Sequence, residues 1–219
     1  MDELNGLNEL IEIPHQFETD LYFLVLENLR ITMEGIDRAE DEELCDIAKN
    51  FTPEERDAEA DASGHAHHFY DELRLAALSL AIVALVTRLQ HWIGRFTKEN
   101  KPVSARRKSK VKDAKSTQKS NSKLVNQLRA LDESLGAGPV PITFFETLVD
   151  IRDSVIHHNS EARWEYGGEE RAVDSRYWNS AFDRLELTED LLREAVDNAT
   201  EQLKWYDERL HTHASKRVQ

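Results

Sequence analysis

Apolar residues recur every three or four positions along most of the chain, a spacing typical of helices that bury one face. Between about 66 and 97 they cover several sides, which favours a central helix. No series of strands supports an α/β sheet. The periodicity predicts helices over about 14–35, 37–50, 66–97, 123–135, 144–158 and 189–211.

Residues with capping preferences mark several of these helix ends. Thr52, Pro53 and Glu55 have the spacing of a capping box with a proline in the first turn. Thr143 and Glu146 repeat the capping-box spacing at the start of the fifth helix. Further boundaries are marked by Asn121 or Ser122, by Gly136 and by Thr188.

One segment departs from the helical period. Residues 162–173, ARWEYGGEERAV, alternate around a central Gly167-Gly168 and contain aromatic residues, which predicts a small β-hairpin. The predicted fold is therefore all-α, an up-and-down helical bundle of about five to six helices with this hairpin. We expect a single domain over 1–219.

Charge is distributed unevenly along the chain. The formal net charge is −14, yet residues 98–123 hold ten Lys or Arg against two Asp or Glu. This segment has almost no apolar residues to bury, so we predict a flexible basic loop over 98–122. Two roles are open, a solvated linker or a contact with RNA phosphates. The candidate RNA-binding residues are Arg106, Arg107, Lys108, Lys110 and Lys112.

The remaining composition indicates a protein of the reducing cytoplasm. Cys45 is the only cysteine, so no intrachain disulfide can form. The acidic N-terminal stretch lacks the pattern of a secretory signal. The longest apolar run, about 75–86, is too short to span a bilayer. We therefore expect a cytoplasmic protein without membrane contact.

The stretch VDIRDSVIHHNS, residues 149–160, belongs to a helix with two apolar stripes. The stripes appear when residues 144–158 are placed at about 100° per residue. A bundle core needs only one of them, so we predict a homodimer in which a second copy covers the other. The core-facing stripe consists of Phe144, Leu148, Ile151 and Val155. The predicted dimer interface consists of Phe145, Val149 and Ile156.

Arg152 and His157 lie in this stretch, with Asp153 between them. The arginine and the histidine are about 140° apart around the helix and about 7.5 Å apart along it, so one straight helix cannot bring both to one small group. Two copies related by a two-fold axis could place Arg152 of one near His157 of the other.

These residue types suit the cleavage of RNA without a metal. Histidine exchanges protons near neutral pH, and arginine holds phosphate oxygens as negative charge develops. The 2′-hydroxyl of RNA supplies the nucleophile. Asp153 could orient Arg152 or a histidine through a hydrogen bond.

The motif IRDSVIHH resembles the HEPN family, whose Arg-x4-6-His motif lies near the end of a late helix. The resemblance implies an α-helical bundle that often dimerises across the motif helices. In active members it implies a metal-independent endoribonuclease, with Arg152 and His157 as the catalytic pair and Asp153 as their polar companion. Asparagine is commoner than aspartate at that position, and the basic loop and hairpin are not general family features.

Two functions follow from the resemblance. The first is an endoribonuclease that acts as a microbial toxin or defence effector, with RNA and an antitoxin or regulatory protein as partners. The second is a non-catalytic helical module that binds a nucleotide or a partner protein, because some family members are inactive. The negative net charge of the chain outside the basic loop favours the second function, and the basic loop itself favours the first.

A histidine cluster offers a competing site for metal. His65, His67 and His68 precede Asp71 and Glu72, and the pairs His67–Asp71 and His68–Glu72 have the spacing that metal ligands use on a helix. Exposed polar residues near the start of a helix need no ligand. We therefore expect no metal and no cofactor.

Overall fold

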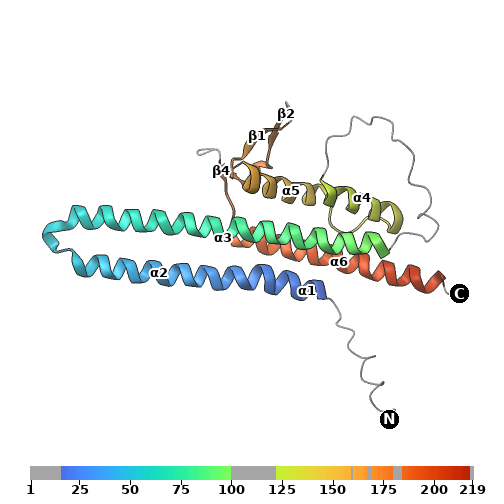
Figure 1. Cartoon of the computed structure of the whole chain (residues 1–219), viewed down its shortest axis with the longest axis horizontal. Helices are drawn as coiled ribbons and strands as arrows, with labels where there is room; N and C mark the ends of the chain where they lie inside the picture. The colour runs from blue at the N-terminus through green and yellow to red at the C-terminus, as the bar shows by residue number, and fades with distance from the viewer. Residues whose placement is uncertain (1–15, 100–121, 159, 167–168, 180–183, 218–219) are drawn as a thin grey trace, which may run out of the picture.

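The computed structural model describes residues 16–99, 122–158, 160–166, 169–179 and 184–217. The helices are α1 Gln16–Leu21, α2 Asn28–Asn50, α3 Arg56–Glu99, α4 Lys123–Leu135, α5 Ile142–His157 and α6 Glu189–Arg217. Figure 1 shows α3 as the long central helix, with α1 and α2 along one side, α6 beside its C-terminal half and α4 and α5 across another face. The predicted all-α bundle is confirmed.

The first two predicted helices form one continuous run in the structure. A π-helical turn, Tyr22–Glu27, joins α1 to α2, and no break occurs near residue 36. Buried residues continue at four-residue spacing through Leu21, Val25 and Leu29. That spacing slightly exceeds an α-helical turn, and the wider π turn keeps these residues on one face. Contact with α3 thus extends the helix past the predicted boundary.

The capping box between α2 and α3 is confirmed. The backbone N–H of Thr52 donates to the Glu55 carboxylate at 3.0 Å, and a short 3₁₀ turn, Pro53–Glu55, leads into α3. This helix therefore begins about ten residues before the predicted start near 66. Its first turns are rich in alanine and charge but lack an apolar stripe, so their periodicity gave no helical signal.

The later helices lie where the sequence predicts them, although α6 runs to Arg217, past the predicted end near residue 211. The Ser122 hydroxyl caps α4, and the Thr188 hydroxyl accepts from Leu191 N at 3.2 Å at the start of α6. The predicted capping box of Thr143 and Glu146 is wrong, because α5 begins at Ile142 without a side-chain cap. The Glu146 carboxylate instead accepts a hydrogen bond from Arg129 of α4 at 2.6 Å.

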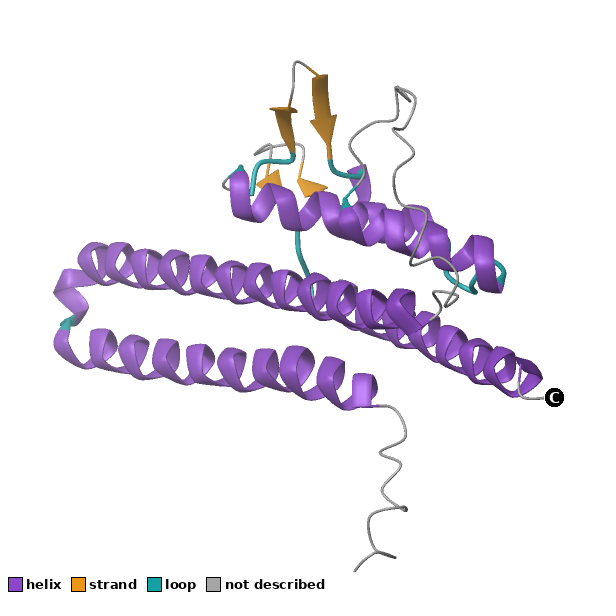
Figure 2. Cartoon of the chain, turned by 45° about the vertical axis from the view of Figure 1, so that its right-hand side comes forward, coloured by secondary structure: helices purple, strands orange, loops and turns teal. Residues whose placement is uncertain are grey.

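The strands lie beside the C-terminal end of α5, as Figure 2 shows. The predicted hairpin is confirmed as β1 Arg163–Tyr166 and β2 Glu169–Ala172, which pair antiparallel. A second pair, β3 Trp178–Asn179 and β4 Arg184–Leu185, was not predicted because each strand has only two residues. A short 3₁₀ turn, Ser175–Tyr177, precedes β3.

The connector between α4 and α5 is fastened to α6 by buried polar groups. The Gln202 side chain is 1% exposed, and its Oε1 accepts from Val140 N at 3.1 Å. Asp132 of α4 accepts from the Tyr206 hydroxyl at 2.6 Å and from Gly138 N of the connector at 3.3 Å. Gly138 lies so close that a Cβ there would be 1.9 Å from Gln202 Nε2. This contact fixes where α5 begins.

Gly138→Ala should lower the free energy of unfolding by about 1–3 kcal/mol, the usual cost of overpacking a filled site. The added methyl must displace Gln202 and so break its bond to Val140. Urea denaturation would measure the change. Gly35→Ala is the matched control, since a Cβ at Gly35 meets nothing within 4 Å and should stabilise α2 by about 0.5–1 kcal/mol. Equal stability of the two variants would contradict this role of Gly138.

Candidate functional site

Both apolar stripes of α5, the helix that carries the motif, contain residues buried within the single chain. Leu148 and Ile151 face the core as predicted, but Phe145 is 1% exposed and Val149 is 5% exposed within the single chain. Their assignment to a dimer interface is therefore wrong. The physical reason is that α5 packs against both α3 and α4, which together cover more than one stripe.

Ile156 is the one predicted interface residue that remains exposed. Its side chain is 49% exposed at the C-terminal end of α5. Ile156 alone does not require a second copy of the chain, because isolated apolar residues are normal at protein surfaces. A dimer stays a prediction, without Phe145 and Val149 as its support.

Arg152 and Asp153 form an ion pair on the motif helix. Nε of Arg152 donates to Asp153 Oδ1 at 2.8 Å, and Nη2 donates to the same oxygen. The two side chains are 20% and 27% exposed. The sequence left open whether Asp153 orients Arg152 or a histidine, and in the structure its carboxylate bonds to Arg152. The carboxylate holds the guanidinium in place and also offsets its charge.

His157 is the last residue of α5 and is exposed, whereas His158 is half-buried. The two rings lie with their centroids 6.3 Å apart. His157 follows Arg152 by five residues, so it lies about 7.5 Å further along the axis and on another side of the helix. A single copy thus presents an oriented arginine and an exposed histidine on different sides of one helix end.

Ser154 ties down the chain directly after the motif, a role that the sequence analysis missed. It is fully buried, and its hydroxyl donates to the carbonyl of Glu161 at 2.6 Å. Its carbonyl accepts the N–H groups of His158 at 2.9 Å and Ser160 at 3.1 Å. The signal in the sequence was a small polar residue beside the core-facing stripe of α5, since a buried hydroxyl needs a partner.

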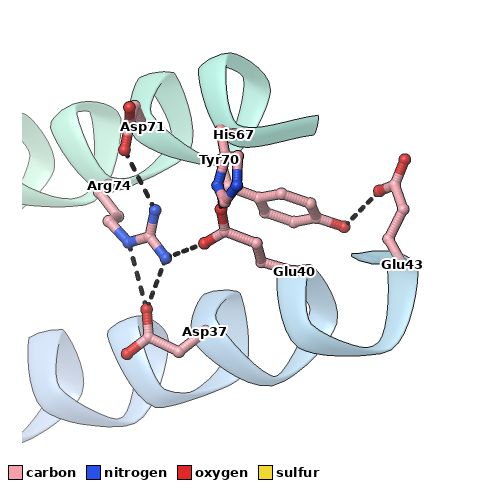
Figure 3. Close-up of polar contacts among 7 residues, drawn as sticks. All are labelled: Asp37, Glu40, Glu43, His67, Tyr70, Asp71 and Arg74. Carbon is pink, nitrogen blue, oxygen red and sulfur yellow. Dashed lines mark hydrogen bonds and ion pairs between the residues drawn. The ribbon is translucent and has the colours of Figure 1, made fainter. Parts of the chain in front are cut away.

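His67, one member of the histidine cluster, takes part in an ion-pair network between α2 and α3 (Figure 3). Nδ1 of His67 lies 2.6 Å from Glu40 Oε1. Arg74 donates to Asp37 and Glu40 on α2 and to Asp71 on its own helix. The guanidinium thus occupies the space between three carboxylates. Within the described residues, no group of three or more His, Cys, Asp or Glu side chains is arranged to hold a metal ion.

A hollow of about 380 Å³ lies at the other end of α5 from the motif. Carboxylates outnumber cations in it, because Asp174, Glu194 and Glu201 face it with Arg176 as its single basic residue. Arg176 is itself paired with Asp174 at 3.0 Å. This charge balance disfavours the binding of phosphate groups.

Two further expectations concern the surface. The candidate RNA-binding residues lie outside the described part of the chain. These residues are Arg106, Arg107, Lys108, Lys110 and Lys112.

No described helix combines the length and the apolar character that crossing a membrane requires.

Comparison of the chain with known protein families, with curated proteins and with solved structures found no match. Function is therefore inferred from the chain's own residues, above all from the end of α5.

The network between α2 and α3 should make stability depend on acid pH. The Arg74 guanidinium holds the pKa of the Glu40 carboxyl below its ordinary value against the opposing effect of burial, and His67 adds to this. A carboxyl whose pKa is lowered by folding stabilises the fold fully above its unfolded pKa. That contribution is lost as the pH falls through the folded pKa.

We expect Glu40→Gln to unfold more readily than the wild type at neutral pH and to lose less further stability on acidification. Urea denaturation between neutral pH and pH 3 would measure both effects. Asp46→Asn is the control, because the Asp46–Lys49 pair is exposed and such pairs contribute little. Parallel pH curves for the wild type and Glu40→Gln would overturn the assignment.

Proposed function

We propose that this protein is a metal-independent endoribonuclease of HEPN type, with Arg152 and His157 as its catalytic pair. The observation that carries the proposal is the end of α5, where Asp153 orients a partly exposed Arg152 five residues before the exposed His157. The all-α bundle and the position of the motif on a late helix support it.

In the proposed reaction the 2′-hydroxyl of RNA attacks the adjacent phosphorus and the bond to the 5′-oxygen breaks. A histidine accepts the 2′-proton, and a protonated group returns a proton to the leaving 5′-oxygen. Arg152 stabilises the negative charge that builds up on the phosphate oxygens. The hydrogen bonds of Arg152 to Asp153 use Nε and Nη2, and Nη1 is the nitrogen proposed to contact the phosphate.

We further propose that two copies share each site. Arg152 and His157 point in directions about 140° apart, so a second copy is the simplest source of the missing partner. Ile156 lies between them around the helix and is 49% exposed, which suits a contact at this point. The remaining contact surface must come from outside α5's buried stripes. A toxin or defence role in the cytoplasm, with an antitoxin or regulatory partner, follows from the resemblance and is part of the proposal.

A non-catalytic binding module is the second candidate. The ion pair with Asp153 favours it, because the carboxylate reduces the positive charge that Arg152 can offer to RNA. A partner protein is then a better ligand than a nucleotide, since the hollow at the far end of α5 is lined mainly by carboxylates.

The purified chain should cleave RNA in the presence of EDTA and leave a 2′,3′-cyclic phosphate or its hydrolysis product. RNA with a 2′-deoxy residue at the cleaved position should resist, because its nucleophile is absent. Arg152→Ala and His157→Ala should each lower kcat about a hundredfold or more. His158→Ala is the matched control and should cost less. Cleavage that EDTA abolishes would contradict the proposal. So would a chain that cleaves none of the RNAs tested and that purifies together with a bound partner protein.

A shared site predicts complementation between inactive chains. Arg152→Ala and His157→Ala chains should recover part of the activity when mixed, because a heterodimer can keep one intact pair. Light scattering should show a dimer at micromolar concentration, and Ile156→Glu should shift it toward the monomer. A wild-type monomer with full activity would exclude the shared site and leave the nuclease assignment standing.

A further inference from the structure

We propose that Ser154 is a positioning residue for His157, acting through the backbone turn that follows α5. The inference rests on the proposed function, because it assigns Ser154 a part in placing the catalytic histidine. Ser154 lies between Arg152 and His157 in the motif but is fully buried, so it cannot touch RNA itself.

Both the side chain and the backbone of Ser154 make hydrogen bonds in this turn. The Ser154 hydroxyl donates to the Glu161 carbonyl at 2.6 Å, and the Ser154 carbonyl accepts from His158 N at 2.9 Å and Ser160 N at 3.1 Å. The carbonyls of a last helical turn have no partner within the helix, and these bonds supply one. These bonds join Ser154 to His158, Ser160 and Glu161, all of which follow His157 in the chain.

The backbone at Ser160 has a conformation that residues with a Cβ rarely adopt. Its φ is +62°, the one positive φ among the described non-glycine residues. A residue with a Cβ stays in this disfavoured region only where its surroundings impose it, and such residues concentrate at functional sites. Here the constraints come from the Ser154 carbonyl and from Leu185 N, which donates to the Ser160 carbonyl at 3.0 Å.

The turn is also connected to the central helix. Glu161 pairs with Arg184 in an isolated bridge, and the Arg184 guanidinium lies 3.6 Å from the Glu72 carboxylate of α3. His157 itself is exposed, and within the described structure its ring contacts the ring of His158. The backbone therefore determines where its imidazole lies, and Ser154 holds that backbone on both sides of it.

Ser154→Ala tests the proposal by removing the hydroxyl alone. At a temperature where circular dichroism shows the variant folded, we expect kcat for RNA cleavage to fall on the order of tenfold with KM nearly unchanged, because small displacements of a catalytic group slow the chemical step. Ile93→Val is the matched control for lost stability. Ile93 is fully buried and lies about 30 Å along α3 from Glu72. It should keep full kcat when folded. Wild-type kcat in Ser154→Ala would overturn the proposal.

A second measurement separates this inference from the nuclease assignment. Hydrogen exchange of the His158 and Ser160 amides reports the loop directly, whether or not the chain cuts RNA. We expect Ser154→Ala to lower the protection of both amides and to shift the His157 ring signals in NMR spectra, with Ile93→Val changing neither. Unchanged protection and ring signals would exclude positioning by Ser154. Loss of protection in a chain that cuts no RNA would refute the nuclease and its positioning residue together, leaving the loop as structure only.

Discussion

Along its C-terminal half, α3 buries apolar side chains on several sides, among them Leu85, Val86 and Ile93. A helix of this kind cannot face water, so other helices must surround it. The run from α1 to α2 covers one side, α6 another, and α4 with α5 a third. Most boundaries of the fold follow from this requirement, including the continuous helix through residue 36 and the start of α5 where its connector meets Gln202.

The N-terminal half of α3 depends on a different interaction. There α3 and α2 project together beyond the other helices, and charged groups join them where apolar residues become fewer. Arg74 holds carboxylates of both helices, and His67 adds a bond to the same Glu40. Glu40 is buried, so its charge must be compensated locally. Of the residues that resemble metal ligands in the sequence, His67 contacts Glu40 and Asp71 contacts Arg74.

The end of α5 combines both kinds of constraint. Phe145 and Val149 fix the helix to the core, and its last turns carry the partly exposed Arg152 and Asp153 and the exposed His157. Asp153 then sets Arg152, and the bonds of Ser154 set the turn after His157. A nuclease site at this place would be held by a rigid helix on one side and by a strained, hydrogen-bonded turn on the other, which is the preorganisation that acid–base chemistry requires.

The sequence by itself determined the all-α class, most helix positions, the capping box at Thr52 and the hairpin, because periodicity and capping act over a few neighbouring residues. It also identified Arg152 and His157 as a pair that one helix cannot bring together. Only the tertiary structure decided what each face of a helix meets. The helices α3 and α4 bury Phe145 and Val149 of α5. Glu146 bonds to Arg129 instead of capping α5, and the Glu161 carbonyl accepts from the Ser154 hydroxyl. Such outcomes depend on packing between distant segments, which local patterns do not encode.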